Sequence, residues 1–575
     1  MTLQDLSRPE TLDTSVRIDI LVEEASVVMS DGTSLHATVT RPDVHLRVPV
    51  IVIRTPYLPF TPVQLDTIAI ARRGAAVVVQ STRGTGQSEG EFEPFLHEVQ
   101  DGVDTAAWCR RQPWSNGRLG SIGRSYLALT QLYTVAGESH GVEAMGLEVC
   151  SGDPYDFVYR GGAFFHGMLV YWAMRHANAS IERRASQGQD MTADRLEWNT
   201  AMDDFGRTVA TTPLADVPTL AKHFPTWQKW LEHPERDQWW ARSDRPQPRE
   251  TGVPALYVGG WHDIFLADTV REFRANRHPD SRLIIGPWAH TASGSVLGQA
   301  NYGYRASADA AGIIRDQVDF VLSRITDTVQ DSAPHSKVRV FVMGGANSWS
   351  DETQWPPRRA RDTEFFLHPG GVLATDPAVD IEGVDSFVHD PHDPVPTVGG
   401  ANFFLGSDSG YRTGQQDQGV LDARTDILRY TSSPFEVDTD ILGAVHATLF
   451  VTSTAPSSDW AVKLIDIDRN GRALDIVDGI VRTPLAVESV DTSSGMTRVA
   501  VDVGETAYRV RAGHRIRVDI SGSNFPRFDR NPGTDGLPGM VPAEEFRTAE
   551  QSVSVAAGAA SFVTVPLSRA AESAS

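Results

Sequence analysis

The chain has 575 residues, more than one hydrophobic core usually supports, so we expect roughly two to four domains. Hydrophobic residues make up 41% and charged residues 22% of it, which is typical of a soluble globular protein. With 52 lysines and arginines against 74 aspartates and glutamates, the net charge of −22 disfavours nucleic acid as a partner and disfavours membrane attachment.

Residues 16–41 predict a β-hairpin, and the apolar runs 48–53 and 75–79 are typical of strands buried on both faces of a mainly parallel sheet. Alternating helix and strand patterns then follow: a helix at about 99–111, a strand at 119–122, a helix at 127–135, strands at 142–149, 254–258 and 283–285, and a helix at 314–325. This alternation predicts an α/β sheet.

The segment 151–245 interrupts the sheet pattern and has no strand pattern of its own. It holds six of the 13 tryptophans, at positions 172, 198, 227, 230, 239 and 240, among helical runs. An insertion at this place is expected to form a helical lid over the sheet. Most of these tryptophans are expected simply to pack the helices together.

After residue 357 short alternating strands take over, as at 447–451, 461–467 and 498–503, and no convincing helix is found. This spacing predicts an antiparallel sandwich or jelly roll. Asp466 to Gly471 imitates the start of a calcium loop, but the twelfth position is Val477 instead of a glutamate, so we interpret it as a hairpin turn.

The two cysteines, Cys109 and Cys150, lie in apolar segments without the spacing of a metal site. We therefore expect buried thiols, no disulfide framework, no metal and no cofactor. The first residues lack the features of a signal peptide, and no apolar run reaches the length of a membrane span. The cytoplasm is the predicted location.

The stretch Gly123-Arg124-Ser125-Tyr126-Leu127-Ala128 stands between a predicted strand and a predicted helix. A serine at such a corner is held on a sharp turn with its hydroxyl above the sheet, and the first N–H groups of the helix point at the same place. Ser125 is therefore the candidate nucleophile for acyl transfer, provided that a histidine and a carboxylate reach it.

A second serine, Ser88 in Gly86-Gln87-Ser88-Glu89-Gly90, matches the pattern G-x-S-x-G better, because Leu127 replaces the last glycine in the stretch around Ser125. The strand before Ser88 ends well short of it, and the residues after it cannot begin a helix promptly. We predict that Ser88 is a loop serine. No Gly-Lys-Ser/Thr closes this loop, so it is not a phosphate cradle either.

Two groups that could activate Ser125 follow it in the order of α/β-hydrolases, first Asp263 and then His290. In this hypothesis His290 takes the serine proton and returns it to the leaving group, while Asp263 fixes the tautomer of the imidazole. Taken alone, His290 could be structural and Asp263 could cap a helix. His262 is a rival base, but adjacent side chains on an extended segment point apart.

An oxyanion needs two donors, and the backbone N–H of Tyr126 is expected to be one of them. The other should come from the loop Thr55-Pro56-Tyr57, where Pro56 has no N–H to give. The phenol of Tyr57 is therefore the natural second donor, although Tyr57 alone could be a packed turn residue.

On these motifs the sequence resembles the bacterial cocaine esterase group, within a wider set of hydrolases that includes X-prolyl dipeptidyl peptidases and α-amino-acid ester hydrolases. The likeness covers nearly the whole chain and includes Thr55-Pro56-Tyr57, Gln80-Ser81-Thr82-Arg83-Gly84, Gly123-x-Ser125-Tyr126, Gly260-Trp261-x-Asp263, Gly286-Pro287-Trp288-x-His290, Trp349-x-Asp351-Glu352-Thr353-x-Trp355-Pro356 and Ser523-Asn524-Phe525-Pro526-Arg527. One departure is Ala128, where the group usually has glycine, and alanine is small enough for the turn.

The resemblance implies an α/β fold with an α/β-hydrolase domain in two parts (1–150 and 246–350), a helical cap insertion (151–245) and a C-terminal jelly-roll β-sandwich domain (351–575). It also implies the roles proposed above for the triad and for Tyr57. Trp172, Phe265, Phe403 and Phe404 are its candidates for an aromatic substrate pocket.

The residues after Asp263 indicate the substrate class. Ile264-Phe265-Leu266 stand where the amino-ester hydrolases carry two acids, which favours a neutral or aromatic acyl group. We expect a cofactor-free serine carboxylesterase that acts on a small-molecule ester, without a nucleic acid or membrane partner and with a homodimer as the assembly considered. Two alternatives stay open: an X-prolyl dipeptidyl aminopeptidase or α-amino-acid ester hydrolase whose ammonium site is Asp153 and Asp156, and a ligand-binding protein with an idle hydrolase domain.

Overall fold

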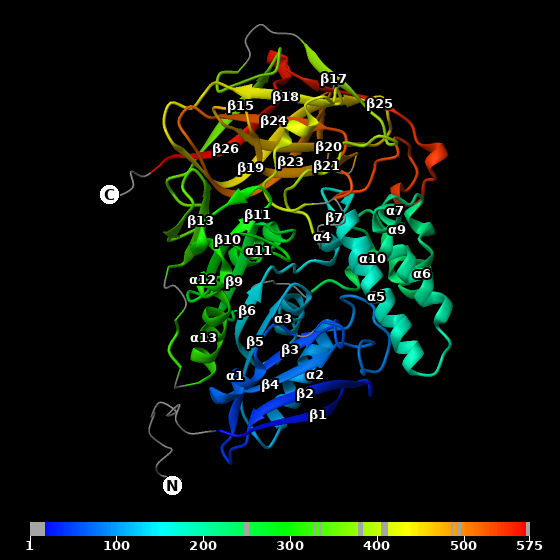
Figure 1. Ribbon diagram of the computed structural model, residues 1–575, viewed down its shortest axis with the longest axis vertical. Coiled ribbons are helices and arrows are strands. Elements are labelled where there is room, and N and C mark those ends of the chain that lie inside the picture. The colour runs from blue at the N-terminus through cyan, green and yellow to red at the C-terminus, as the bar shows by residue number, and fades with distance from the viewer. Residues whose placement is uncertain are drawn as a thin grey trace.

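A computed structural model describes residues 18–570, except 62, 246–251, 327–328, 333–335, 378–382, 404–411, 485–486 and 492–495. Figure 1 shows three regions: an α/β region at the lower left, a group of helices at the right and a β-rich region at the top. The predicted start of the first hairpin, residues 16–17, lies outside the described residues.

The α/β region is built on one sheet whose central strands are parallel. Its order is β1-β2-β4-β3-β5-β6-β9-β10-β13-β14, with antiparallel pairs only at β1–β2, β2–β4 and β13–β14. The bounds are β1 Ile20–Val28, β2 Ser34–Pro42, β3 Val48–Thr55, β4 Ala76–Ser81, β5 Ser115–Arg124, β6 Val142–Glu148, β9 Ala255–His262, β10 Arg282–Ala289, β13 Val338–Gly344 and β14 Ser348–Glu352. The predicted alternation of strands and helices is confirmed.

Helices cover both faces of this sheet, which explains why its central strands are apolar throughout. Side chains of α1 (Thr67–Arg72) and α13 (Ile313–Ile325) pack against one face. Those of α2 (Glu98–Arg111), α3 (Tyr126–Ala136) and α11 (Leu266–Ala275) pack against the other. Cys109 and Cys150 are buried free thiols, as expected.

The described residues of the segment between β6 and β9 form helices and two short strands, β7 (Tyr159–Arg160) and β8 (Ala163–Phe164). Its helices are α4 (Pro154–Val158), α5 (His166–Ser186), α6 (Thr192–Asp203), α7 (Phe205–Ala210), α8 (Pro218–His223), α9 (Thr226–Glu232) and α10 (Gln238–Ala241). Trp172, Trp227, Trp230 and Trp240 are buried in a single hydrophobic cluster, so these tryptophans do pack the cap together. No helix among the described residues is long and apolar enough to cross a membrane.

The strands described in the C-terminal region pair antiparallel with one another, except for the short parallel pair of β16 (Val372–Ala374) with β18 (Ile427–Ser432). Its described residues contain no α-helix after α13. One set pairs as β22-β23-β19-β26-β15 and the other as β18-β24-β20-β21. The shorter members, besides β18, are β15 (Arg361–His368), β22 (Val487–Asp491), β24 (Arg515–Ser521) and β26 (Phe562–Arg569). The longest members are β19 (Thr439–Ser453), β20 (Ser458–Ile467), β21 (Ala473–Thr483) and β23 (Met496–Val510). Asp468 accepts hydrogen bonds from two backbone N–H groups of the β20–β21 turn, which confirms the hairpin interpretation of the calcium-like motif.

The β-rich region binds residues 161–167 of the cap, which lead into α5 and which we call the cap root. The backbone N–H of Phe164 donates to the Asp529 carboxylate at 2.9 Å, and the N–H of Gly167, at the start of α5, donates to the carbonyl of Pro526. Arg482 donates its backbone N–H to the carbonyl of Gly161, and its side chain is ion-paired with Asp529. A Cβ at Gly161 would lie 2.2 Å from a backbone oxygen, so only glycine permits this approach.

Candidate active site

Ser125 stands at the corner between β5 and α3, as predicted. Its backbone lies in the left-handed half of φ/ψ space, with φ 57° and ψ −125°, the strained conformation of a nucleophile elbow. Gly123 makes the turn possible, because a Cβ there would lie 2.5 Å from the side chain of Leu127. Ala128 is fully buried, so the chain accommodates an alanine at this position after the turn.

His290 and Asp263 reach Ser125 from the ends of two neighbouring parallel strands, β10 and β9. The Nε2 atom of His290 lies 2.9 Å from the Ser125 Oγ, and its Nδ1 atom lies 2.8 Å from Oδ2 of Asp263. The other Asp263 oxygen accepts the backbone N–H of Phe265 at 2.7 Å. The three side chains therefore form one continuous hydrogen-bonded chain with the geometry of a catalytic triad.

The two rival residues have other partners. His262 does not line the cavity at Ser125; its Nε2 atom lies 3.1 Å from the Tyr302 hydroxyl, and burial lowers its pKa to about 4. Ser88 is 1% exposed, accepts the backbone N–H of His36 at 2.9 Å and donates to the carbonyl of Ser81 at 2.8 Å. Ser88 is a loop serine that ties its own turn together, as predicted.

Tyr57 lies on the loop after β3, beside Ser125. Its hydroxyl oxygen accepts the indole N–H of Trp172 at 3.1 Å, which leaves the phenol proton free to be donated. Burial raises the pKa of Tyr57, while hydrogen bonds with Trp172 and Ser125 and the charges of Arg175 and Arg124 oppose that rise. Its backbone N–H is already donated to the Thr55 hydroxyl, so only the phenol can act as an oxyanion donor here.

Tyr126 is the first residue of α3, so its N–H is one of the four without an acceptor inside the helix. Its phenol is buried, donates to the Glu98 carboxylate at 3.0 Å and accepts the N–H of Phe95. Glu98 is ion-paired at 2.9 Å with Arg54, which stands just before the Tyr57 loop. The buried Arg54–Glu98 ion pair therefore holds the Tyr126 phenol, and Arg54 lies three residues before Tyr57 in the chain.

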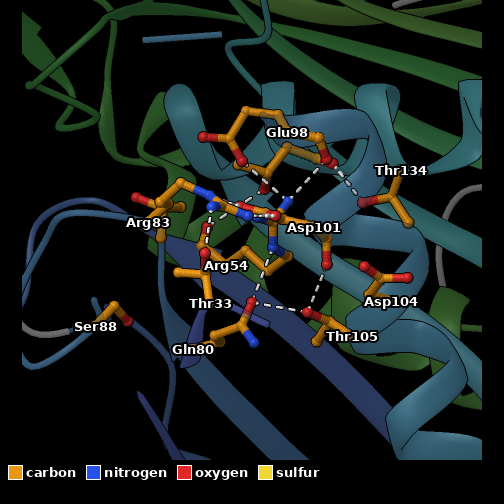
Figure 2. Close-up of polar contacts among 12 residues, drawn as sticks. Thr33, Arg54, Gln80, Arg83, Ser88, Glu98, Asp101, Asp104, Thr105 and Thr134 are labelled. Carbon is orange, nitrogen blue, oxygen red and sulfur yellow. Dashed lines mark hydrogen bonds and ion pairs between the residues drawn. The ribbon is translucent and has the colours of Figure 1, made fainter. Parts of the chain in front are cut away.

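Figure 2 shows how this ion pair continues into a wider network. The guanidinium of Arg54 also donates to the side chain of Gln80 at 3.0 Å. Asp101 lies 3.9 Å from Arg54 and is held at 2.6 Å by Arg83, on the glycine-rich loop that carries Ser88. The glycine-rich loop is therefore part of the network of ion pairs and hydrogen bonds that supports the candidate site.

A cavity of about 310 Å³ opens above Ser125. Aromatic and aliphatic side chains make most of its wall, and its lining residues are Thr55, Tyr57, Thr61, Val63, Gln64, Arg124, Ser125, Leu127, Phe157, Met168, Trp172, Arg175, Ile264, Phe265, His290, Thr291 and Phe403. Phe265 and Phe403 flank the imidazole of His290, with ring centroids 5.3 and 5.2 Å from it. Such a wall suits a substrate with an apolar or aromatic group.

Three of the four residues predicted for the pocket therefore line it, and Phe404 lies outside the described residues. Phe157, Met168 and Arg175 also line the cavity and were not predicted from the sequence. Met168 and Arg175 stand four residues before and three after Trp172 on α5, so the helical period around that tryptophan was the signal that could have found them.

Asp153 and Asp156, the proposed ammonium site, do not line this cavity. Asp153 accepts two backbone N–H groups at the start of α4. The guanidinium of Arg236 lies 2.8 Å from Asp153 and 3.0 Å from Asp156, and Arg271 lies 2.7 Å from Asp156. Their charge is thus already compensated. Over the described part of the chain no group of three or more histidine, cysteine or acidic side chains is arranged to hold a metal ion.

Comparison with known proteins gives the following matches. The sequence profile of the X-Pro dipeptidyl-peptidases (S15 family) matches residues 31–292, and that of the X-Pro dipeptidyl-peptidase C-terminal non-catalytic domain matches residues 331–564. The cocaine esterase of Rhodococcus sp. (strain MB1 Bresler) is 32% identical over 569 residues, covering 94% of this chain and 97% of the relative.

Two solved structures share the fold along the whole chain. An α-amino acid ester hydrolase superposes with a TM-score of 0.74 at 22% identity, covering 99% of both chains. An aminopeptidase from a marine sediment Thaumarchaeota archaeon superposes with a TM-score of 0.74 at 21% identity, covering 98% of both chains.

Proposed function

Because this chain belongs to the S15 family, together with cocaine esterase, and is a serine carboxylester hydrolase, we propose that Ser125, His290 and Asp263 are its catalytic triad. One observation carries this assignment: an unbroken chain of short hydrogen bonds from the Ser125 hydroxyl through His290 to Asp263, at the base of the apolar cavity.

In the proposed reaction the Ser125 Oγ attacks the carbonyl carbon of the ester while His290 Nε2 takes the hydroxyl proton. The carbonyl π-electrons move onto oxygen, and the oxyanion is met by the Tyr57 phenol and the Tyr126 N–H. When the tetrahedral intermediate collapses, His290 gives its proton to the departing alkoxide. The products of this half-reaction are a free alcohol and an acyl group on Ser125.

Water then attacks the acyl-enzyme by the same steps. Water is now the nucleophile, and Ser125 is the leaving group. His290 takes a proton from water, the hydroxide attacks the acyl carbon, and collapse returns the proton to Ser125 and releases the acid. The Asp263 carboxylate stabilises the imidazolium in both halves. The bond from the Phe265 N–H to the second oxygen of Asp263 keeps the carboxylate turned toward His290.

The acyl group that suits this cavity is neutral or aromatic. Phe265, Phe403 and Trp172 supply apolar rings, and Ile264 stands beside Asp263. An amino-acyl or dipeptidyl substrate would place an ammonium against this wall without a carboxylate partner, and burying such a charge is costly. The same site therefore supports a carboxylesterase better than an aminopeptidase or amino-ester hydrolase.

Labelling and a substrate panel test this function. A fluorophosphonate probe should modify the wild-type chain and leave Ser125→Ala unmodified, which also separates an enzyme from a binding protein with an idle hydrolase domain. Benzoyl, alkyl and α-amino-acyl esters of one alcohol should then be compared with an X-Pro anilide. Faster turnover of the free-amine ester or the anilide would overturn the proposed acyl preference.

The location and assembly of the chain are further proposals. We place it in the cytoplasm, on the sequence features described above, and cell fractionation tests this. A homodimer is the proposed assembly, and sedimentation of the purified chain would reveal a monomer if the proposal is wrong.

A further inference from the structure

The cavity above Ser125 is positively charged, although the chain as a whole has a net charge of −22. Two guanidinium groups, those of Arg124 and Arg175, are part of its wall. Among the described residues no aspartate or glutamate lines it. A cavity of this kind repels an ammonium and attracts an anion.

The guanidinium of Arg124 already has polar partners within the chain. Its guanidinium lies 3.6 Å from the Glu148 carboxylate, and it donates to Gln64 at 3.0 Å and to the backbone carbonyl of His290. Arg124 therefore holds the strand end that carries the imidazole, and its charge has a counter-ion.

The charge of Arg175 has no such partner. Its guanidinium donates to the hydroxyl of Thr61, and its carbon lies 5.8 Å from the centre of the Tyr57 ring. Both contacts are with neutral groups, and within the described part of the chain no carboxylate is ion-paired with it. Arg54, Arg482 and Arg527, by contrast, are each paired with an acid at 3 Å or less.

Arg175 is also placed where a bound substrate can reach it. It shares α5 with Trp172, whose indole binds the Tyr57 phenol, so the guanidinium lies close to the candidate oxyanion donor. Arg175 and Tyr57 also line a neighbouring cavity of about 340 Å³, together with Phe60, Trp198 and Met202. An arm of the substrate that extends away from Ser125 therefore passes the guanidinium.

We propose that Arg175 binds a carboxylate on the substrate, so that the preferred esters carry a free acid group in addition to the ester bond. This inference rests on the proposed function, because the ester must lie at Ser125. A half-buried guanidinium is well suited to a planar carboxylate, which can accept two parallel N–H groups. The carboxylate can stand on the acyl side or on the alcohol side of the ester.

Two pairs of matched esters test the proposal. On the acyl side, the 4-nitrophenyl half-ester of adipic acid is compared with the same ester in which the free acid is a primary amide. On the alcohol side, the benzoate of 3-(4-hydroxyphenyl)propanoic acid is compared with the benzoate of its amide. The measured quantity is the ratio of kcat/KM for the acid to kcat/KM for the amide.

In the wild-type chain we expect this ratio to reach roughly 10 to 100 in one of the two pairs, the gain typical of a charge-assisted hydrogen bond. Arg175→Gln should bring it close to one, and raising the salt concentration should lower it. The matched control is Arg184→Gln, which removes the same charge from the same helix at a residue that does not line the cavity. This control should keep the wild-type ratio.

Two results would overturn the inference. A ratio near one in both pairs for the wild-type chain would show that no carboxylate is recognised. A ratio that Arg175→Gln leaves unchanged while both members of a pair slow down equally would make Arg175 a support for Tyr57 only. Failure of the proposed function is a different result, because then none of the four esters would depend on Ser125.

Discussion

Replacing Ser125 and Ser88 by alanine should separate catalysis from stability. Ser125→Ala removes the atom that we propose to attack the substrate, so kcat for ester hydrolysis should fall by roughly 10⁵- to 10⁶-fold. Ser88→Ala should keep most of the activity, because the Ser88 hydroxyl is bonded only to its own turn and to β2.

The stability effects should be reversed. Without its hydroxyl, position 88 leaves the Ser81 carbonyl and the His36 N–H without their partner. A buried group that loses its partner costs about 1–3 kcal/mol. Since the bond to His36 is only partly buried, we expect Ser88→Ala to lose about 1–3 kcal/mol of unfolding free energy in total. Ser125→Ala loses the hydrogen bonds to His290 and Tyr57, but both residues line the cavity, where water can take the place of the hydroxyl. Its unfolding free energy should therefore stay close to the wild-type value.

Ester turnover, fluorophosphonate labelling and urea unfolding of the three chains, at a temperature where all are folded, form the assay. The reasoning is refuted if Ser88→Ala abolishes labelling in its folded state. It is also refuted if the two variants lose activity in parallel, because then the strand-turn-helix context would not identify the nucleophile.

The other predictions concern single side chains. Tyr57→Phe should lower kcat by roughly 10²- to 10³-fold with little change in KM, and a raised KM with intact kcat would mean that the phenol binds substrate instead. Phe265→Ala should reduce kcat/KM for a benzoyl ester more than for an acetyl ester, and an equal loss would remove Phe265 from the acyl pocket. Burial lowers the pKa of His176 to about 3 and that of His262 to about 4. Their folded-state pKa values lie below the unfolded value of about 6.5. Their contribution to the unfolding free energy is therefore fully present above that pH and is lost progressively as the pH falls below it. His176→Phe should remove about 2 kcal/mol of the difference in unfolding free energy between pH 7 and pH 5, and an unchanged difference in urea titrations would contradict this.

Much of the site could be predicted because its parts are local. The turn at Ser125 follows from a strand, a glycine and a helix that lie together between Ser115 and Ala136. Asp263 and His290 each end a parallel strand, and the carboxyl ends of neighbouring parallel strands meet at one edge of the sheet. Their approach to Ser125 is therefore a consequence of the predicted sheet.

The parts that were missed depend on contacts between distant segments. Asp153 and Asp156 looked available for an ammonium group because nothing near them in the sequence neutralises them. Arg236 and Arg271, which do so, come from beyond α9 and from α11. In the same way, the inward face of α5 is set by how the cap rests on the sheet, so Arg175 was not predicted at the cavity.

The anchoring of the cap root to the β-rich region has a consequence for how the chain can be dissected. Asp529 and Arg482 bind the cap root, which leads into α5. Trp172 on α5 lines the cavity of the candidate active site. The C-terminal region therefore holds one wall of a cavity to which, among the described residues, it contributes Phe403 alone. An isolated hydrolase half would keep its nucleophile and lose its pocket, so a shortened chain should still react with a small phosphonate while it turns over bulky esters poorly.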